Sequence, residues 1–234
     1  MLVAAAVCPH PPLIVPELAA GAAGELDALR RACDAAVAAL ADARPDRVVV
    51  VGTGPESADF AKGGTGSFAP FGVDLAVRLG EGGTGDGTER LPESLAVGAW
   101  LLARTPVGVP VSGLAVAAGA DAADCLASGA ELAAGDERIA LLVLGDGSAC
   151  RTEKAPGYLD ARAEAYDAAI AAALGGADVL ALAGLDPELA DQLWVAGRAA
   201  WQVLAGAADG AGLTGTLTYE DAPYGVGYFV AVWR

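Results

Sequence analysis

Short apolar runs alternate along the chain with longer stretches in which alanine and leucine recur at helical spacing. Short runs rich in β-branched residues and bounded by turn residues are typical of buried strands. They predict strands at residues 1–7, 47–51, 73–79, 107–117, 138–144, 178–182, 215–220 and 227–233. The helical spacing, interrupted by proline and glycine, predicts helices at residues 22–43, 92–104, 121–134, 157–174 and 187–207.

Strands that alternate with helices favour right-handed βαβ units, and therefore a mostly parallel central sheet with helices on both faces. The chain has no repeat at a solenoid period and no linker long enough to divide it, so we expect a single α/β domain over residues 1–234. We expect the glycine-rich segment 80–88 to be the most flexible part of the chain.

The composition excludes several classes of protein. Of the 234 residues, 54% are hydrophobic and 19% are charged, which excludes disorder by composition. The net charge of −16 repels phosphate backbones and anionic lipids, so we expect neither nucleic-acid nor membrane partners. The uncharged stretches 1–16 and 105–120 are shorter than the ~20 residues of a membrane span and contain prolines. No basic segment precedes the first apolar run, so we expect no signal peptide and a cytoplasmic location.

Histidine and cysteine set limits on the chemistry. The chain contains one histidine, His10, which excludes a mechanism or a metal site that needs two histidines from one subunit. Its four cysteines are far apart and form no CxxC pair, so the sequence shows neither a zinc knuckle nor a redox motif. We expect these cysteines to be ordinary buried thiols.

Candidate site residues stand at the ends of predicted strands, where open α/β sheets bind their ligands. They are His10, the turn 53–56, Asp146 with Ser148, and Glu220 with Asp221. The proline-stiffened loop around His10 suits a positioned imidazole, which can ligate a metal or act as a general base. The opposing hypothesis is that His10 has a structural role and only forms hydrogen bonds with nearby backbone groups.

Two further motifs give weaker indications. Ser148 with His10 and a carboxylate could form a hydrolytic triad, but residues 145–149 do not read G-x-S-x-G, and Asp and Ser after a strand more often stabilise a turn. Gly52 and Gly54 form half of a dinucleotide fingerprint, and Pro55 removes one backbone donor. Nucleotide binding is therefore disfavoured.

The aromatic residues of the two C-terminal predicted helices favour packing roles. Tyr158, Arg162 and Tyr166 recur at helical spacing and are expected to share one helix face. Trp194 and Trp201 are expected in the core or at a subunit contact.

Four short segments carry a family resemblance, in this order along the chain: 9–11 (PHP), 46–54 (DRVVVVGTG), 144–148 (LGDGS) and 222–226 (APYGV). The chain resembles the class III extradiol ring-cleavage dioxygenase catalytic-subunit (LigB-like) superfamily, which contains the Memo-like proteins. More specifically, it resembles the uncharacterised, alanine-rich actinobacterial branch of that superfamily. The resemblance covers most of the chain and implies the LigB-like α/β fold.

The resemblance also implies site residues. Active members hold Fe(II) with two histidines and a carboxylate, and use a further histidine as acid and base. His10 matches the first ligand, Glu56 stands near the position of the second, and Glu220 matches the third. Asp146 and Ser148 belong to the motif that ends in the acid–base histidine, where this chain has alanine. Two of the three histidines are therefore missing.

This departure implies a degenerate site that binds a divalent metal more weakly or not at all, with ring-cleavage activity altered or lost. Three hypotheses follow: a metal-dependent oxidoreductase acting on a small molecule, a non-catalytic Memo-like module that binds a small molecule or a partner segment, and a hydrolase that uses Ser148. The sequence leaves open whether the chain has a structural role in an assembly, whether it forms a homo-oligomer and whether it has a partner subunit.

Overall fold

The computed structural model describes residues 1–80 and 90–234. The segment 80–88, expected to be the most flexible, therefore lies outside the described residues except for Gly80. Within the described ranges, no helix is both long enough and apolar enough to cross a membrane.

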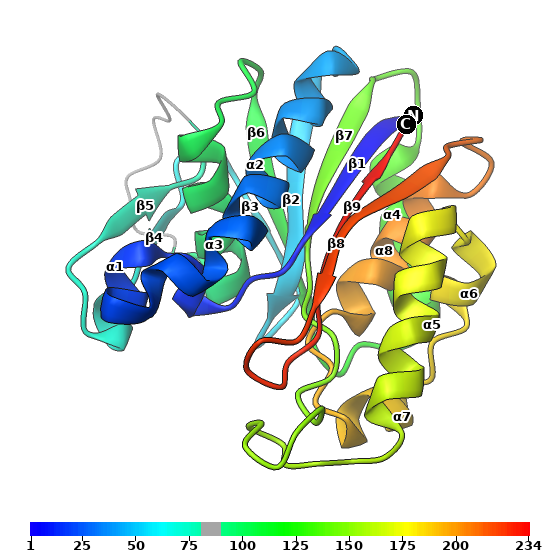
Figure 1. Ribbon diagram of the computed structural model, residues 1–234. Helices are drawn as coiled ribbons and strands as arrows, with labels where there is room; N and C mark the ends of the chain where they lie inside the picture. Colours follow the sequence, from blue (N-terminus) through cyan, green and yellow to red (C-terminus); the bar gives the residue numbers. More distant parts are fainter. Residues whose placement is uncertain (81–89) are drawn as a thin grey trace.

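A twisted sheet forms the centre of the molecule (Figure 1). In the described part of the chain it has seven strands in the order β3-β6-β2-β7-β1-β9-β8. The strands are β1 (Leu2–Cys8), β2 (Arg47–Gly54), β3 (Ala58–Phe60), β6 (Val111–Ala117), β7 (Ile139–Leu144), β8 (Gly215–Asp221) and β9 (Tyr228–Trp233). The central strands β6, β2, β7 and β1 are parallel, whereas β3 and β9 run antiparallel to their neighbours. The predicted α/β class with a mostly parallel sheet is confirmed.

Helices cover both faces of the sheet (Figure 1). One face carries α2 (Asp27–Asp42) and α3 (Glu93–Arg104), and the other carries α4 (Ala122–Ala133), α5 (Ala163–Gly176) and α8 (Arg198–Ala208). The smaller elements are α1 (Pro16–Ala19), α6 (Val179–Ala183), α7 (Pro187–Gln192), the 3-10 helices η1 (Pro12–Ile14), η2 (Ala20–Leu26) and η3 (Ala69–Phe71), and the β4–β5 pair (Thr65–Ser67 and Ala76–Arg78).

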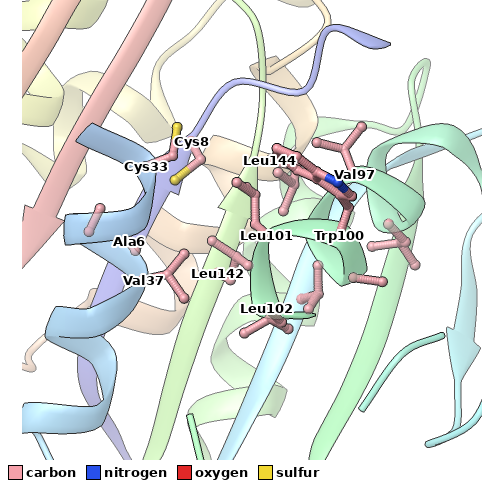
Figure 2. Packing of buried hydrophobic residues seen from close by; sticks show 14 of the residues in the cluster. Ala6, Cys8, Cys33, Val37, Val97, Trp100, Leu101, Leu102, Leu142 and Leu144 are labelled. Carbon is pink, nitrogen blue, oxygen red and sulfur yellow. The ribbon is translucent and has the colours of Figure 1, made fainter. Parts of the chain in front are cut away.

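The core has two apolar layers, because alternate residues of each strand face opposite sides of the sheet. Figure 2 shows the layer under α2 and α3, where Cys8 of β1 lies close to Cys33 of α2. In the other layer α4 and α8 cross at Gly129 and Gly206, each of which contacts the backbone of the opposite helix. The small residues of this alanine-rich chain permit that close packing.

Two predicted elements are wrong. The structure has the helix α6 (Val179–Ala183) where a strand is predicted over residues 178–182, because a short apolar pattern does not distinguish strand from helix. The Asp178 carboxylate caps this helix by accepting the Ala181 N–H at 3.0 Å. The predicted helix 187–207 is two helices, because residues 193–197 leave the helical path and Trp194 has a φ of 55°.

The remaining helix predictions differ at their starts. The helix expected from residue 157 begins at Ala163, and Tyr158 lies in the preceding loop with a φ of 62°. Tyr158 and Tyr166 therefore do not share a helix face. The helix expected from residue 22 begins at Asp27, after η2.

One predicted strand is shorter than expected. The strand expected over residues 73–79 is reduced to β5, which pairs with β4 in a separate small sheet.

Candidate functional site

His10 and Asp146 are brought together by the register of two adjacent parallel strands. Cys8 of β1 pairs with Leu144 of β7, and His10 and Asp146 stand at equivalent positions just beyond that pair. The His10 backbone N–H donates to Asp146 Oδ1 at 2.8 Å, and His10 Nδ1 lies 3.7 Å from the same oxygen. The hydrogen bond joins two loops at the carboxyl edge of the sheet.

The imidazole of His10 is buried and incompletely satisfied. The residue is 7% exposed, and its Nδ1 atom has no hydrogen-bond partner. A buried polar atom without a partner is costly, and such atoms in native proteins commonly face a water or a ligand. An Nδ1 atom that lies beside a carboxylate and makes no hydrogen bond does not match a histidine that only satisfies backbone groups.

The Asp146 carboxylate is held in a poorly solvated environment. Burial raises the pKa of Asp146, while the charge of His10 and the hydrogen bond from its backbone N–H oppose that rise. The backbone carbonyl of Asp146 also accepts the Gly197 N–H at 2.9 Å. Asp146 is thus fixed on one side by the loop after β1 and on the other by the segment that precedes α8.

Glu93 supplies a second carboxylate that the sequence did not reveal. It is the first residue of α3 and follows Pro92, the residue at the N-cap. Partial burial raises the pKa of Glu93, the charge of His10 lowers it and the charge of Asp146 raises it. These effects place the Glu93 carboxylate within electrostatic range of both site residues. The Pro-Glu start of a helix was the available signal, but only packing of α3 on β2 and β7 brings it to this edge.

Buried groups of low polarity line the inner side of the site. Tyr228 begins β9 and is 2% exposed, and burial together with the Asp146 charge raises the pKa of its hydroxyl. Burial also raises the pKa of the Cys33 thiol, as do its hydrogen bond with Cys8 and the charge of Asp146. Both thiols lie in the layer between β1 and α2 (Figure 2). The raised pKa values keep the Tyr228 hydroxyl and the Cys33 thiol protonated near neutral pH, so neither adds a negative charge beside Asp146.

Ser148 belongs to a different network. Its side chain is fully buried, and its hydroxyl donates to Asp167 Oδ2 at 2.8 Å while its backbone N–H donates to Asp167 Oδ1 at 2.8 Å. Arg151 Nη1 donates to the same carboxylate at 3.2 Å. Burial raises the pKa of Asp167, and the hydrogen bonds from Ser148 and Arg151 oppose that rise. Ser148 therefore anchors the loop after β7 to α5 and makes no pair with His10.

The two glutamates that the resemblance implies as metal ligands are placed differently from His10. The Glu56 side chain is exposed just beyond β2, and Glu220 is exposed on the outer strand β8, where it pairs with Phe229. Within residues 1–80 and 90–234, no three side chains of His, Cys, Asp or Glu are grouped so that they could hold a metal ion. His10, Glu56 and Glu220 thus do not fit a three-ligand iron site in this structure. The structure instead places Asp146 beside His10, with Glu93 within electrostatic range of both.

Comparisons with known proteins give the fold and no function. No family model matches the chain, and no curated protein matches it. Among solved structures, the chain is similar to an uncharacterised protein, JW3007, from Escherichia coli K12, with a TM-score of 0.54 and 17% sequence identity. The match covers 99% of each chain. At this identity the similarity shows a shared fold over the whole length.

Proposed function

We propose that this domain binds a small molecule at the carboxyl edge of its sheet, with His10 as the acid–base group and Asp146 as the carboxylate that orients it. The observation that carries the proposal is the His10–Asp146 pair, in which Nδ1 of a buried imidazole lies 3.7 Å from a carboxylate oxygen. The family resemblance supports the same edge of the sheet as the binding site.

The chemistry follows from the two nitrogens of the imidazole. A carboxylate near Nδ1 favours a proton on that nitrogen and leaves the Nε2 lone pair to accept a proton from a bound molecule. A weakly acidic hydroxyl group, such as that of a phenol or catechol, is a suitable proton donor. Glu93, on the α3 side, would accept a hydrogen bond from a second hydroxyl group of the same molecule.

Metal-dependent ring cleavage is not the activity that this geometry supports best. Fe(II) would supply the site that binds the diol and dioxygen together, but its implied ligands His10, Glu56 and Glu220 are not grouped. We therefore assign proton transfer and binding to His10 and derive no step through a metal. We further propose a cytoplasmic location without nucleic-acid or membrane partners, supported by the net charge of −16.

A binding module without turnover is the second candidate. Ala149 stands where the resemblance implies an acid–base histidine, and it is buried. Under this alternative His10 and Asp146 hold the ligand and no reaction follows. The two candidates share a site and differ in whether the bound molecule is consumed.

Catechol is the first probe, because it combines two weakly acidic hydroxyl groups. With a chelator present, catechol should shift the NMR signals of the single imidazole in the wild type, in Glu56→Gln and in Glu220→Gln. The shift should be lost in Asp146→Ala and reduced in Glu93→Gln. Equal shifts in all five proteins, or none in the wild type, would contradict the proposal.

Metal content separates this site from the one that the resemblance implies. After anaerobic incubation with Fe(II) and desalting, we expect well under one iron per chain. Stoichiometric iron in the wild type that is lost in His10→Ala, Glu56→Gln and Glu220→Gln would restore the three-ligand hypothesis and overturn the assignment of Asp146 and Glu93.

A further inference from the structure

A cavity of about 410 Å³ lies at the carboxyl edge of the sheet, on the face that carries α8. Its wall includes Ala118 and Gly119, which follow β6, together with Asp191, Trp194, Val195 and Arg198. The segment between α7 and α8 is tied to the site loop, since Gly197 N–H donates to the Asp146 carbonyl and Ala149 N–H donates to the Leu193 carbonyl. The cavity is therefore built on rigid contacts and uses none of the side chains of the His10 site.

Arg198 places a buried positive charge in this wall. The residue is 4% exposed, and its guanidinium donates to the carbonyls of Ala118 and Ala120 and, at 3.0 Å, to Gln202 Oε1. These acceptors are all neutral. None of the ion pairs in the described part of the chain involves Arg198. A buried cation held only by neutral groups is stabilised by an anion that enters the cavity.

Trp194 gives the cavity a flat apolar wall. Trp194 is 60% exposed, whereas Trp100, Trp201 and Trp233 are each 8% exposed or less. Its backbone is held at a φ of 55°, a conformation that non-glycine residues rarely adopt. Hydrogen bonds fix this turn, from Trp194 N–H to the Asp191 carbonyl and from Val195 N–H to the Ala190 carbonyl. This left-handed turn caps the end of α7 and holds the large Trp194 ring at the cavity, exposed to solvent.

The charge of the cavity selects the kind of anion. Asp191 contributes a carboxylate to the same wall, and the chain as a whole carries a net charge of −16. Together they disfavour a doubly charged phosphate and favour a single negative charge directed at Arg198. A guanidinium binds a carboxylate through paired N–H donors.

We infer that this cavity binds a small monocarboxylate with a planar apolar body, with its carboxylate at Arg198 and its flat face against Trp194. Benzoate is the simplest probe of this class. Benzamide has the same shape without the charge, and phenyl phosphate has the same ring with a larger charge.

Fluorescence tests the inference directly, because Trp194 is the exposed tryptophan that acrylamide can reach. Benzoate should protect the tryptophan emission from acrylamide quenching, and benzamide and phenyl phosphate should bind roughly tenfold more weakly or worse. Trp194→Ala should weaken benzoate binding, measured by calorimetry, by a similar factor, and Asp191→Asn should strengthen it.

Arg198→Lys keeps the positive charge but loses the paired N–H donors. It should therefore weaken benzoate binding without abolishing it. If Arg198→Lys does not fold, benzoate binding by Trp194→Ala and Asp191→Asn decides the test. Equal binding of benzoate and benzamide, binding unchanged in Trp194→Ala, or no protection of the emission would overturn the inference. The imidazole signals of His10 should not move when benzoate fills this cavity, so failure here is separate from failure of the His10 site.

Discussion

The backbone N–H of His10 donates a 2.8 Å hydrogen bond to Asp146 Oδ1, and this bond joins the loops that follow β1 and β7. The register of the two parallel strands makes the contact, since Cys8 pairs with Leu144. A single carboxylate thereby fixes the backbone of the histidine loop and lies beside its imidazole. The proposed site therefore depends on Asp146 for the position of the histidine loop as well as for its charge.

Asp146→Ala should destabilise the fold and Asp146→Asn much less. Alanine leaves the buried His10 N–H without an acceptor, which costs about 1–3 kcal/mol of the free energy of unfolding. Asparagine keeps an acceptor oxygen in the same place. Urea titrations of the two variants measure the difference. Glu56→Gln is the matched control because the Glu56 side chain is exposed, and equal losses in all three variants would contradict the structural role of Asp146.

Stability should rise as the pH falls from about 7 towards the unfolded carboxyl pKa values of about 4. Burial raises the pKa of Asp146, Glu93 and Asp167, so their contribution to stability is complete below the unfolded values and is lost as pH rises through the folded values. Protonation also reduces the repulsion implied by a net charge of −16. Melting temperatures over this range provide the measurement.

The variant Asp167→Asn provides the control for that pH dependence. It removes one of the three carboxyl groups with a raised pKa in residues 1–80 and 90–234, so its stability should change less steeply with pH than that of the wild type. A wild-type melting temperature that falls steadily from about pH 7 to about pH 5 would show that these buried carboxylates do not dominate.

Ser148 should be unreactive towards fluorophosphonate probes. Its hydroxyl is fully buried and donates to Asp167, so a probe or a substrate cannot reach it in the folded protein. Ser148→Ala should lower the free energy of unfolding by about 1.5–3 kcal/mol, the range for a hydrogen bond to a charged group, and leave catechol binding unchanged. Stoichiometric labelling of the wild type that Ser148→Ala abolishes would revive the hydrolase hypothesis.

The four cysteines should not react with a thiol reagent such as DTNB until the chain unfolds. All four are buried and free, as the sequence predicted, and burial raises the pKa of Cys33, Cys125 and Cys150. The thiolate is the reactive form, and it is scarce when the pKa is high. Counting released thionitrobenzoate with and without guanidinium chloride measures this. Rapid release of one equivalent from the native protein would contradict the burial of that thiol.

The sequence predicted the parts of the fold that depend on local pattern. β1, β2 and β7 are apolar runs buried on both faces, and the residues that follow them, His10 and Asp146, were recognisable as strand-end candidates. The break between α7 and α8 was not recognisable, because it depends on hydrogen bonds to the distant loop after β7. Local spacing cannot encode such contacts.

The site was only partly predictable for the same reason. Glu93 belongs to it through the packing of α3 on the sheet, which no motif records. The resemblance implies Glu56 and Glu220 as metal ligands, but both side chains are exposed. Among the described residues, neither forms with His10 a group that could hold a metal ion. Ser148 follows a strand as expected, and its partner Asp167 comes from α5 rather than from a neighbouring loop.

The most direct test of the His10–Asp146 site is the nitrogen-15 NMR spectrum of the imidazole. The chain has one histidine, so its two nitrogen signals need no assignment by mutation. We expect the neutral imidazole of the wild type to carry its proton on Nδ1, beside Asp146, and we expect Asp146→Asn to change that tautomer or its nitrogen shifts. Identical spectra for the wild type and Asp146→Asn, with the proton on Nε2 in both, would contradict the proposed role of this pair.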